Sequence, residues 1–147
     1  MALKRTPHWA TREFHQFLVA RAKTPFQYGT NDCSMFAADA IKAITGTDIA
    51  AEFRGTYNDA PSSLRAIHRI TGGTTVEDAA VWIAKKHGLE ERQHPLTAQR
   101  GDLVLIPNAD GTLIAGVVHL NGRHAVSVGE NGVQRFSIST VKRAWKI

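Results

Sequence analysis

Residues 25–46 read PFQYGTNDCSMFAADAIKAITG, a turn followed by one amphipathic helix. Gly29 and Asp32 are turn-forming residues, and they stand before a run in which apolar residues recur every three or four positions. Asp32 is a preferred N-cap residue, and Gly46 supplies the left-handed residue that often ends a helix. This pattern places Cys33 in the first turn of the helix.

Helical periodicity continues on both sides of this segment. It predicts a helix over about 6–22, which ends by Thr24 because a residue before proline is pushed away from helical angles. Two further helices are predicted over about 61–70 and 76–87, each followed by glycine. The chain from about residue 6 to residue 88 is therefore predicted to be helical.

The last third of the chain changes to the period of a β-sheet. Short β-branched runs occupy residues 103–106, 113–120, 123–128 and 133–138. Asn121-Gly122 and Asn131-Gly132 separate these runs, and this dipeptide favours hairpin turns. Helices followed by antiparallel strands, over about 103–147, predict an α+β fold with a helical N-terminal half packed on a C-terminal antiparallel β-sheet. Because no repeat or linker divides the chain, we expect a single domain over residues 1–147.

The composition excludes several classes of protein. Cys33 is the only cysteine, so it forms no internal disulfide, and no histidine pair has metal-ligand spacing with a third ligand; we expect neither a metal nor a cofactor. No apolar run is long enough for a membrane span, and we expect no signal peptide and synthesis in a cytoplasm. The net charge of +5 favours acidic partners, but Lys and Arg lie singly or in pairs, which makes nucleic acid an unlikely partner.

Cys33 is the candidate nucleophile. A thiol reacts as the thiolate, and the unpaired N–H groups at a helix N-terminus favour negative charge there. The same N–H groups suit the oxyanion of a tetrahedral intermediate. The alternative is an inert cysteine, since free cysteines are among the most often buried residues. Both interpretations stay open on these residues alone.

The same residues resemble the NlpC-like cysteine peptidases, a papain-related family that cleaves peptide bonds in bacterial peptidoglycan. The likeness lies in an aromatic-Gly turn that leads into Asp-Cys-Ser, in GDLVLI at 101–106 and in GVVHLNG at 116–122. The chain is more similar still to a compact branch of this superfamily found among tail proteins of long-tailed phages and prophages. That likeness runs almost end to end, through EFRGTY at 52–57 and AWKI at 144–147.

The resemblance implies a papain-like, NlpC-type domain located in the virion tail, at or near the tail tip, with other tail proteins as partners. It assigns the nucleophile to Cys33, with Tyr28, Asp32 and Ser34 as supporting residues. In active members a histidine begins the second strand and a second polar residue lies on the third strand. Ile114 and Val126 stand at these two positions here, and neither accepts a proton.

Two other histidines are candidates for the missing base. Side chains alternate between the faces of a strand, so His119 points away from the face that Ile114 occupies. His124 shares the face of Val126, about 7 Å along the strand, which makes His124 the better candidate. For both residues the alternative is a strand histidine without a catalytic role. Phe26 stands where the family has a tyrosine, and it offers no hydroxyl group.

Two functions follow. The first is a structural or assembly subunit at a phage or prophage tail tip, with a degenerate catalytic site. The alternative is an active thiol-dependent peptidoglycan endopeptidase or amidase that helps the tail to penetrate the cell wall. In the alternative, Cys33 attacks the amide carbon and His124 or His119 moves the proton. The two functions differ in whether an imidazole can reach the Cys33 sulfur.

Overall fold

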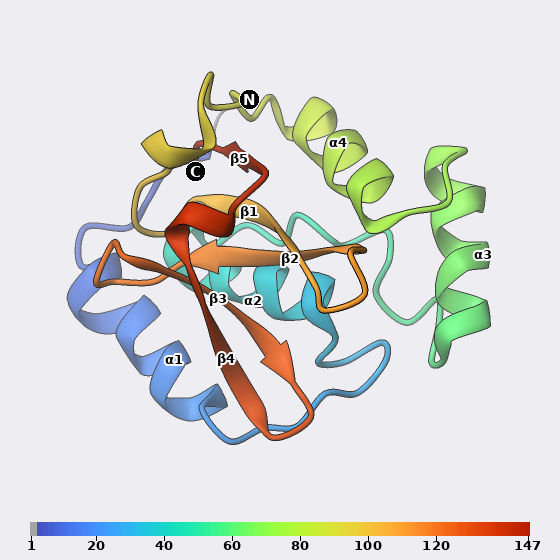
Figure 1. Ribbon diagram of the computed structural model, residues 1–147, viewed down its shortest axis with the longest axis horizontal. Helices are drawn as coiled ribbons and strands as arrows, with labels where there is room; N and C mark the ends of the chain where they lie inside the picture. The colour runs from blue at the N-terminus through green and yellow to red at the C-terminus, as the bar shows by residue number, and fades with distance from the viewer. Residues whose placement is uncertain (1–2) are drawn as a thin grey trace.

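The computed structural model describes residues 3–147, and in it the helices precede the strands (Figure 1). A π-helical turn, Trp9–Glu13, runs directly into the first α-helix. The α-helices are α1 (Phe14–Arg21), α2 (Cys33–Thr45), α3 (Ala60–Thr71) and α4 (Val76–His87). The strands are β1 (Leu103–Pro107), β2 (Leu113–Val118), β3 (His124–Gly129), β4 (Gly132–Ser137) and β5 (Arg143–Trp145), with short 3-10 turns at Pro95–Thr97 and Ile138–Thr140. The predicted α+β arrangement is confirmed.

The strands form one antiparallel sheet in the order β4-β3-β2-β1-β5. Four strands follow the predicted meander. The fifth strand, β5, pairs with β1 on the side away from β2 and was not predicted. A strand of three residues is too short to show the alternation of apolar and polar residues that marks a strand in the sequence. Its conformation comes from pairing with β1.

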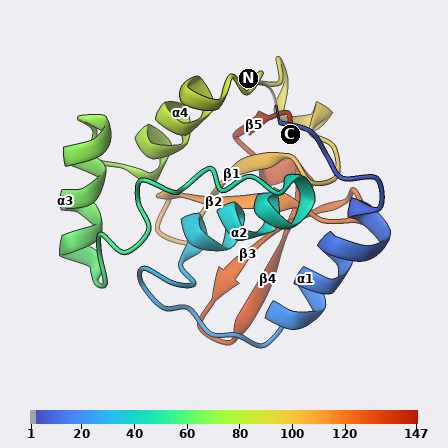
Figure 2. The same cartoon turned by 180° about the vertical axis from the view of Figure 1, so that it is seen from behind.

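The core lies between α2 and the sheet, which are stacked as two layers (Figure 2). Met35, Phe36, Ile41 and Ile44 of α2 are fully buried there. The opposite face of the sheet is also apolar, and its buried residues are Val104, Ile106, Val118, Ala125 and Ala144. Val141, which follows the 3-10 turn Ile138–Thr140, packs with them. A sheet covered on both faces explains why residues 103–106 are a continuous apolar run and not an alternating one.

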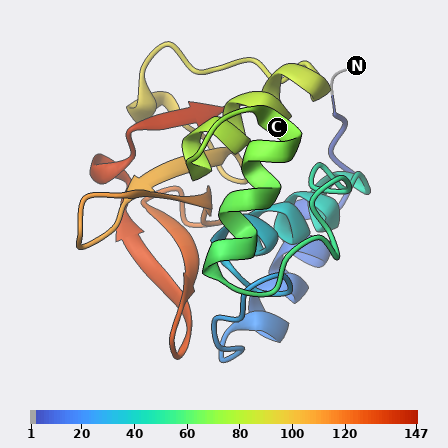
Figure 3. The same cartoon turned by 90° about the vertical axis from the view of Figure 1, so that its right-hand side faces the viewer.

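Helices α3 and α4 begin with capping boxes and lie at one side of the α2 layer (Figure 3). The box at the start of α4, Thr75 with Asp78, is the one that its sequence spacing favours. Helix α3 packs on α4 and stands away from the sheet (Figure 1). No helix between residues 3 and 147 has the length and hydropathy to cross a bilayer.

Strands β2 and β3 are paired over only two residues each, Val117 with Val126 and Val118 with Ala125. Toward the start of β2 the strands separate, and the Ser127 hydroxyl donates to the Ala115 carbonyl across the gap at 2.7 Å. Figure 1 shows β3 leaving the direction of β2 at this end. The gap opens next to the N-terminus of α2, where Cys33 lies.

Candidate functional site at the start of helix α2

Asp32 organises the turn before α2. Its side chain accepts hydrogen bonds from the backbone N–H groups of Met35, at 2.9 Å, and Gly29, at 2.8 Å. The first of these is the N-cap bond that the sequence predicts, and Cys33 is the first residue of α2. The Tyr57 hydroxyl also donates to this carboxylate, at 2.6 Å. Burial and the adjacent negative charge raise the pKa of Tyr57, which keeps its proton on the phenol.

Gly29 is required by the close approach of this turn to Tyr57. Its φ is +86°, in the left-handed region that favours glycine. A Cβ at this position would also collide with the backbone carbonyl of Tyr57. The turn before α2 and the segment between α2 and α3 therefore fit together only with glycine at position 29.

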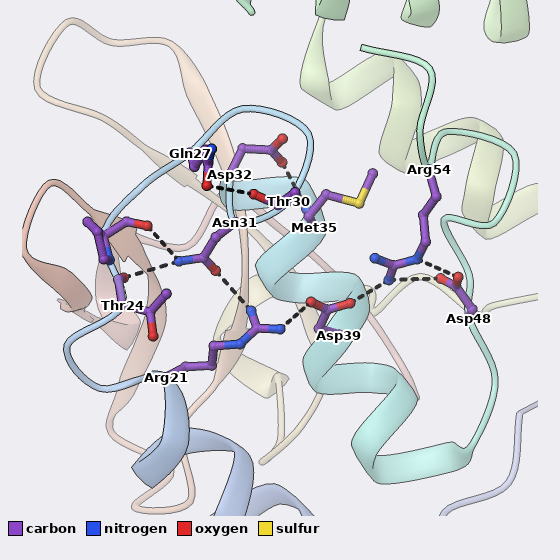
Figure 4. Close-up of polar contacts among 11 residues, drawn as sticks. Arg21, Thr24, Gln27, Thr30, Asn31, Asp32, Met35, Asp39, Asp48 and Arg54 are labelled. Carbon is purple, nitrogen blue, oxygen red and sulfur yellow. Dashed lines mark hydrogen bonds and ion pairs between the residues drawn. The ribbon is translucent and has the colours of Figure 1, made fainter. Parts of the chain in front are cut away.

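A chain of charged and polar groups fixes this turn relative to α1 and α2 (Figure 4). The buried Asn31 amide donates to the carbonyls of Thr24, at 3.1 Å, and Pro25, at 2.9 Å. Arg21 of α1 donates to Asn31 at 2.9 Å and to Asp39 of α2 at 2.6 Å. The Cys33 turn is thus anchored from two sides.

The chain of ion pairs continues beyond α2. Arg54 donates to the second oxygen of Asp39 and also to Asp48, in the segment between α2 and α3 (Figure 4). Both basic partners of Asp39 come from outside α2. Because α1, α2 and the following segment share these contacts, the position of the thiol is set by three parts of the chain.

The environment of Cys33 does not favour the thiolate. The sulfur lies 3.9 Å from the Ser34 hydroxyl, and the residue is half-buried. Burial raises the pKa of the Cys33 thiol, and the Asp32 carboxylate adds to this effect. The peptide groups of Ala115 and Ser34 oppose the shift without cancelling it. Desolvation and the neighbouring negative charge therefore act against the stabilisation of the thiolate that the sequence predicts at a helix N-terminus.

Two adjoining hollows meet at Cys33. The first, about 640 Å³, lies among α2, α3, α4 and the start of β2, and is lined mainly by apolar side chains. The second, about 680 Å³, lies between the start of β2 and the β3–β4 turn. Both are lined by Phe26, Cys33, Asn108 and Ile114. We call the two hollows together the groove.

The structure brings some of the predicted site residues together. Tyr28, Asp32 and Ser34 line the first hollow together with Cys33. Ile114 lines both hollows, whereas Val126 is fully buried and lines neither. On β3 the residues that line the groove are Val128 and Gly129.

The two candidate bases lie at the far end of the hairpin. His119 follows the end of β2, and its backbone N–H donates to the His124 carbonyl at 2.8 Å. His119 lies five positions after Ile114, about 16 Å along an extended strand. Neither histidine lines the groove, so the structure does not bring His124 or His119 to Cys33.

Sequence reasoning missed two residues of this site. Tyr57 buttresses Asp32 from the segment between α2 and α3, and Asn108 enters the groove from the β1–β2 turn. Tyr57 lies in the EFRGTY segment and Asn108 in a turn, but neither pattern indicates a place at the site, because each residue reaches it through tertiary packing. Within residues 3–147, no three His, Cys, Asp or Glu side chains are grouped as ligands for a metal ion.

Comparison with known proteins places the chain in a family. No curated protein and no solved structure is significantly similar to the chain. A family model matches residues 4–147, nearly the whole chain, and its description is a domain of unknown function, DUF6950. The protein therefore belongs to the DUF6950 family.

Proposed function

We propose that this protein is a phage or prophage tail-associated subunit with an NlpC-type, papain-like fold and a degenerate catalytic site. Its role is to bind neighbouring tail proteins through the groove, in a virion tail, and not to cleave peptidoglycan. The resemblance of the sequence supports the tail and the family. The observation that carries the loss of catalysis is the absence of an imidazole among the residues that line the groove around Cys33.

Thiol catalysis needs a base close to the sulfur. The base removes the thiol proton and later protonates the leaving amine, and it must lie within about 3 Å or act through one water. Ile114, at the position that the resemblance assigns to the histidine, lines the groove with a hydrocarbon side chain. The raised pKa of Cys33 favours the protonated thiol near neutral pH. No imidazole in the groove can remove that proton or deliver it to the leaving amine.

The groove has the surface of a binding site. Between residues 3 and 147 six large hydrophobic side chains are exposed, and Phe26, Tyr28 and Leu64 among them line the first hollow. Leu64 is 54% exposed, and the Phe26 and Tyr28 rings meet edge to face at 4.9 Å. Exposed apolar side chains clustered at a hollow are typical of interaction sites.

Digestion of purified peptidoglycan sacculi tests the loss of catalysis. We expect no release of peptides by the unmodified protein, and the same result with Cys33→Ala. Release of peptides that disappears in Cys33→Ala would overturn the proposal and establish the hydrolase.

An Ile114→His variant tests the assigned position of the base. If the NlpC-type arrangement holds, the new imidazole lies near Cys33, lowers the pKa of its thiol and accelerates its alkylation at neutral pH. Leu120→His, beyond the end of β2, is the matched control and should leave the alkylation rate unchanged. Equal rates in both variants would count against the NlpC-type site.

The tail assignment is tested on virus particles. Purified mature particles should contain the protein in a fixed ratio to the other tail proteins. Recovery of the protein from the lysate alone, with none in particles, would contradict the assignment.

A further inference from the structure

We propose that the groove binds an extended polypeptide segment of a partner protein, in which apolar side chains alternate with basic ones on both sides of Cys33. The inference rests on the proposed binding role and deepens it, because it states the chemistry of the partner. Three observations carry it: the charge of the groove, the positions of its carboxylates, and the open edge of β2.

The groove has the opposite charge to the molecule as a whole. The chain has 18 Lys and Arg and 7 His against 13 Asp and Glu, which gives a net charge of +5. Nevertheless no Lys, Arg or His lines either hollow, and the charged residues that do are Asp32, Glu77, Asp110 and Glu130. A groove that carries only carboxylates favours a cationic ligand and repels an anionic one.

Two of these carboxylates remain available to a ligand. Asp32 is buried and bonded within the Cys33 turn, and Glu77 pairs with Arg143 at 2.9 Å. Asp110 is exposed and bonds within its own turn, to Thr112. Glu130 is also exposed, and it forms no ion pair with any residue from 3 to 147.

Asp110 and Glu130 line different hollows, and Cys33 lies where the two hollows meet. Asp110 is in the β1–β2 turn and lines the first hollow, and Glu130 is in the β3–β4 turn and lines the second. Both turns are at the same end of the antiparallel sheet. Because Cys33 lines both hollows, a segment that crosses it meets one carboxylate on each side.

The open edge of β2 favours an extended ligand. Before Val117, β2 is paired with β1 but has no ladder partner in β3. Alternate backbone groups of β2, those of Leu113 and Ala115, therefore face the gap between the strands. The Ala115 carbonyl is already bonded to the Ser127 hydroxyl, so the groups at Leu113 are the ones that a ligand would meet. An extended peptide can add to such an edge, with alternate side chains in the apolar hollows.

Two matched peptides test the proposal. One is an eight-residue peptide of alternating leucine and lysine, the other has glutamate in place of lysine, and both are capped and carry a fluorophore. Anisotropy measures binding to the full chain, and the rate of Cys33 alkylation by N-ethylmaleimide reports whether the bound peptide covers the thiol. We expect the lysine peptide to bind and to slow alkylation, and the glutamate peptide to do neither.

Variants locate the charge preference. Asp110→Asn combined with Glu130→Gln should weaken binding of the lysine peptide roughly three- to tenfold, since two partly exposed ion pairs are lost. Glu90→Gln, exposed and outside the groove, is the matched control and should bind as the unmodified protein does. Circular dichroism verifies that each variant is folded.

Three results would overturn the inference: equal binding of both peptides, binding that leaves alkylation unchanged, and an unaltered affinity in the double variant. Cleavage of the lysine peptide that is lost in Cys33→Ala would contradict the proposed loss of catalysis. It would leave the charge preference of the groove intact, so failures of the two proposals are distinguishable.

Discussion

At the scale of single residues, Asp102 is the buried charge on which most contacts converge. Its side chain is fully buried and pairs with Arg5 at 3.2 Å and Arg92 at 3.0 Å. It also accepts from the backbone N–H groups of Gln99 and Ile147. The Gln99 contact fixes the turn that leads into β1. The structure adds that Asp102 joins segments from both ends of the described chain.

Asp102→Asn should lower the free energy of unfolding by about 3 kcal/mol, because two guanidinium groups lose their anionic partner. Arg5 and Arg92 are partly exposed and can recover some hydration. The expected loss in the free energy of unfolding is therefore near the lower end of the range that is usual when a buried ion pair is broken. Urea denaturation measures the change. Glu90→Gln serves as control and should stay within about 0.5 kcal/mol of the unmodified protein; an equally small effect in Asp102→Asn would contradict this account.

His87 makes stability depend on pH. Its Nε2 is buried and has no hydrogen-bond partner among the described residues. Burial and the nearby Lys86 hold the pKa of His87 below its usual value of 6.5. The unfolded chain therefore binds a proton at a higher pH than the folded chain does, and stability is lost as the pH falls below about 6.5.

In urea denaturation between pH 7.5 and 5.5, His87→Gln should show a smaller loss of stability than the unmodified protein. His68→Gln, exposed on α3, is the control and should retain the full pH dependence. Burial also lowers the pKa of His119, which makes stability fall with pH in the same direction. This contribution is the same in all three proteins and does not affect their comparison. Identical pH profiles for His87→Gln and the unmodified protein would show that another group is responsible.

At the scale of elements, the junction of β2 and β3 shapes the groove. Gly116 lies where the strands approach most closely, and a Cβ there would collide with the Val126 carbonyl. The strands pair just beyond this point and separate before it. The opening of the groove beside Cys33 therefore depends on glycine at 116.

Gly116→Ala should destabilise the fold by about 2 kcal/mol or more, since backbone atoms must move to accept the methyl group. Thermal unfolding followed by circular dichroism measures the loss. Gly111→Ala is an informative comparison: Gly111 has open space but a φ of +86°, so it suffers strain without collision. A smaller loss in Gly116→Ala than in Gly111→Ala would contradict the close approach.

Elements defined by local contacts could be predicted from the sequence. Helix α2 begins at Cys33 and is followed by Gly46 because Asp32 bonds to Met35 and Gly46 adopts a left-handed φ, all within one segment. The prediction of the first helix was less accurate. It covered residues 6–22, whereas the structure has a π turn over Trp9–Glu13 followed by α1, which ends at Arg21. Strand β5 was missed because its conformation comes from pairing with β1.

At the scale of the whole molecule, the site is where three separately predicted parts meet. The turn before α2, the start of β2 and the β3–β4 turn surround Cys33, and Tyr57 and Asn108 join them through tertiary packing. Sequence reasoning found Cys33, Tyr28, Asp32 and Ser34, which lie within one short segment. The sequence favoured His124 over His119, but it could not show that neither lines the groove, because the separation of β2 from β3 is a tertiary property.

The central claim is that Cys33 lies in a binding groove as an unactivated thiol. The rate of Cys33 alkylation by iodoacetamide between pH 6 and 10.5 tests it most directly, with Cys33→Ala as the blank. We predict that the rate rises with a midpoint above 9.0, the usual value for a thiol, because burial and Asp32 raise the pKa. A midpoint near 7 or below, typical of activated cysteines, would contradict the account.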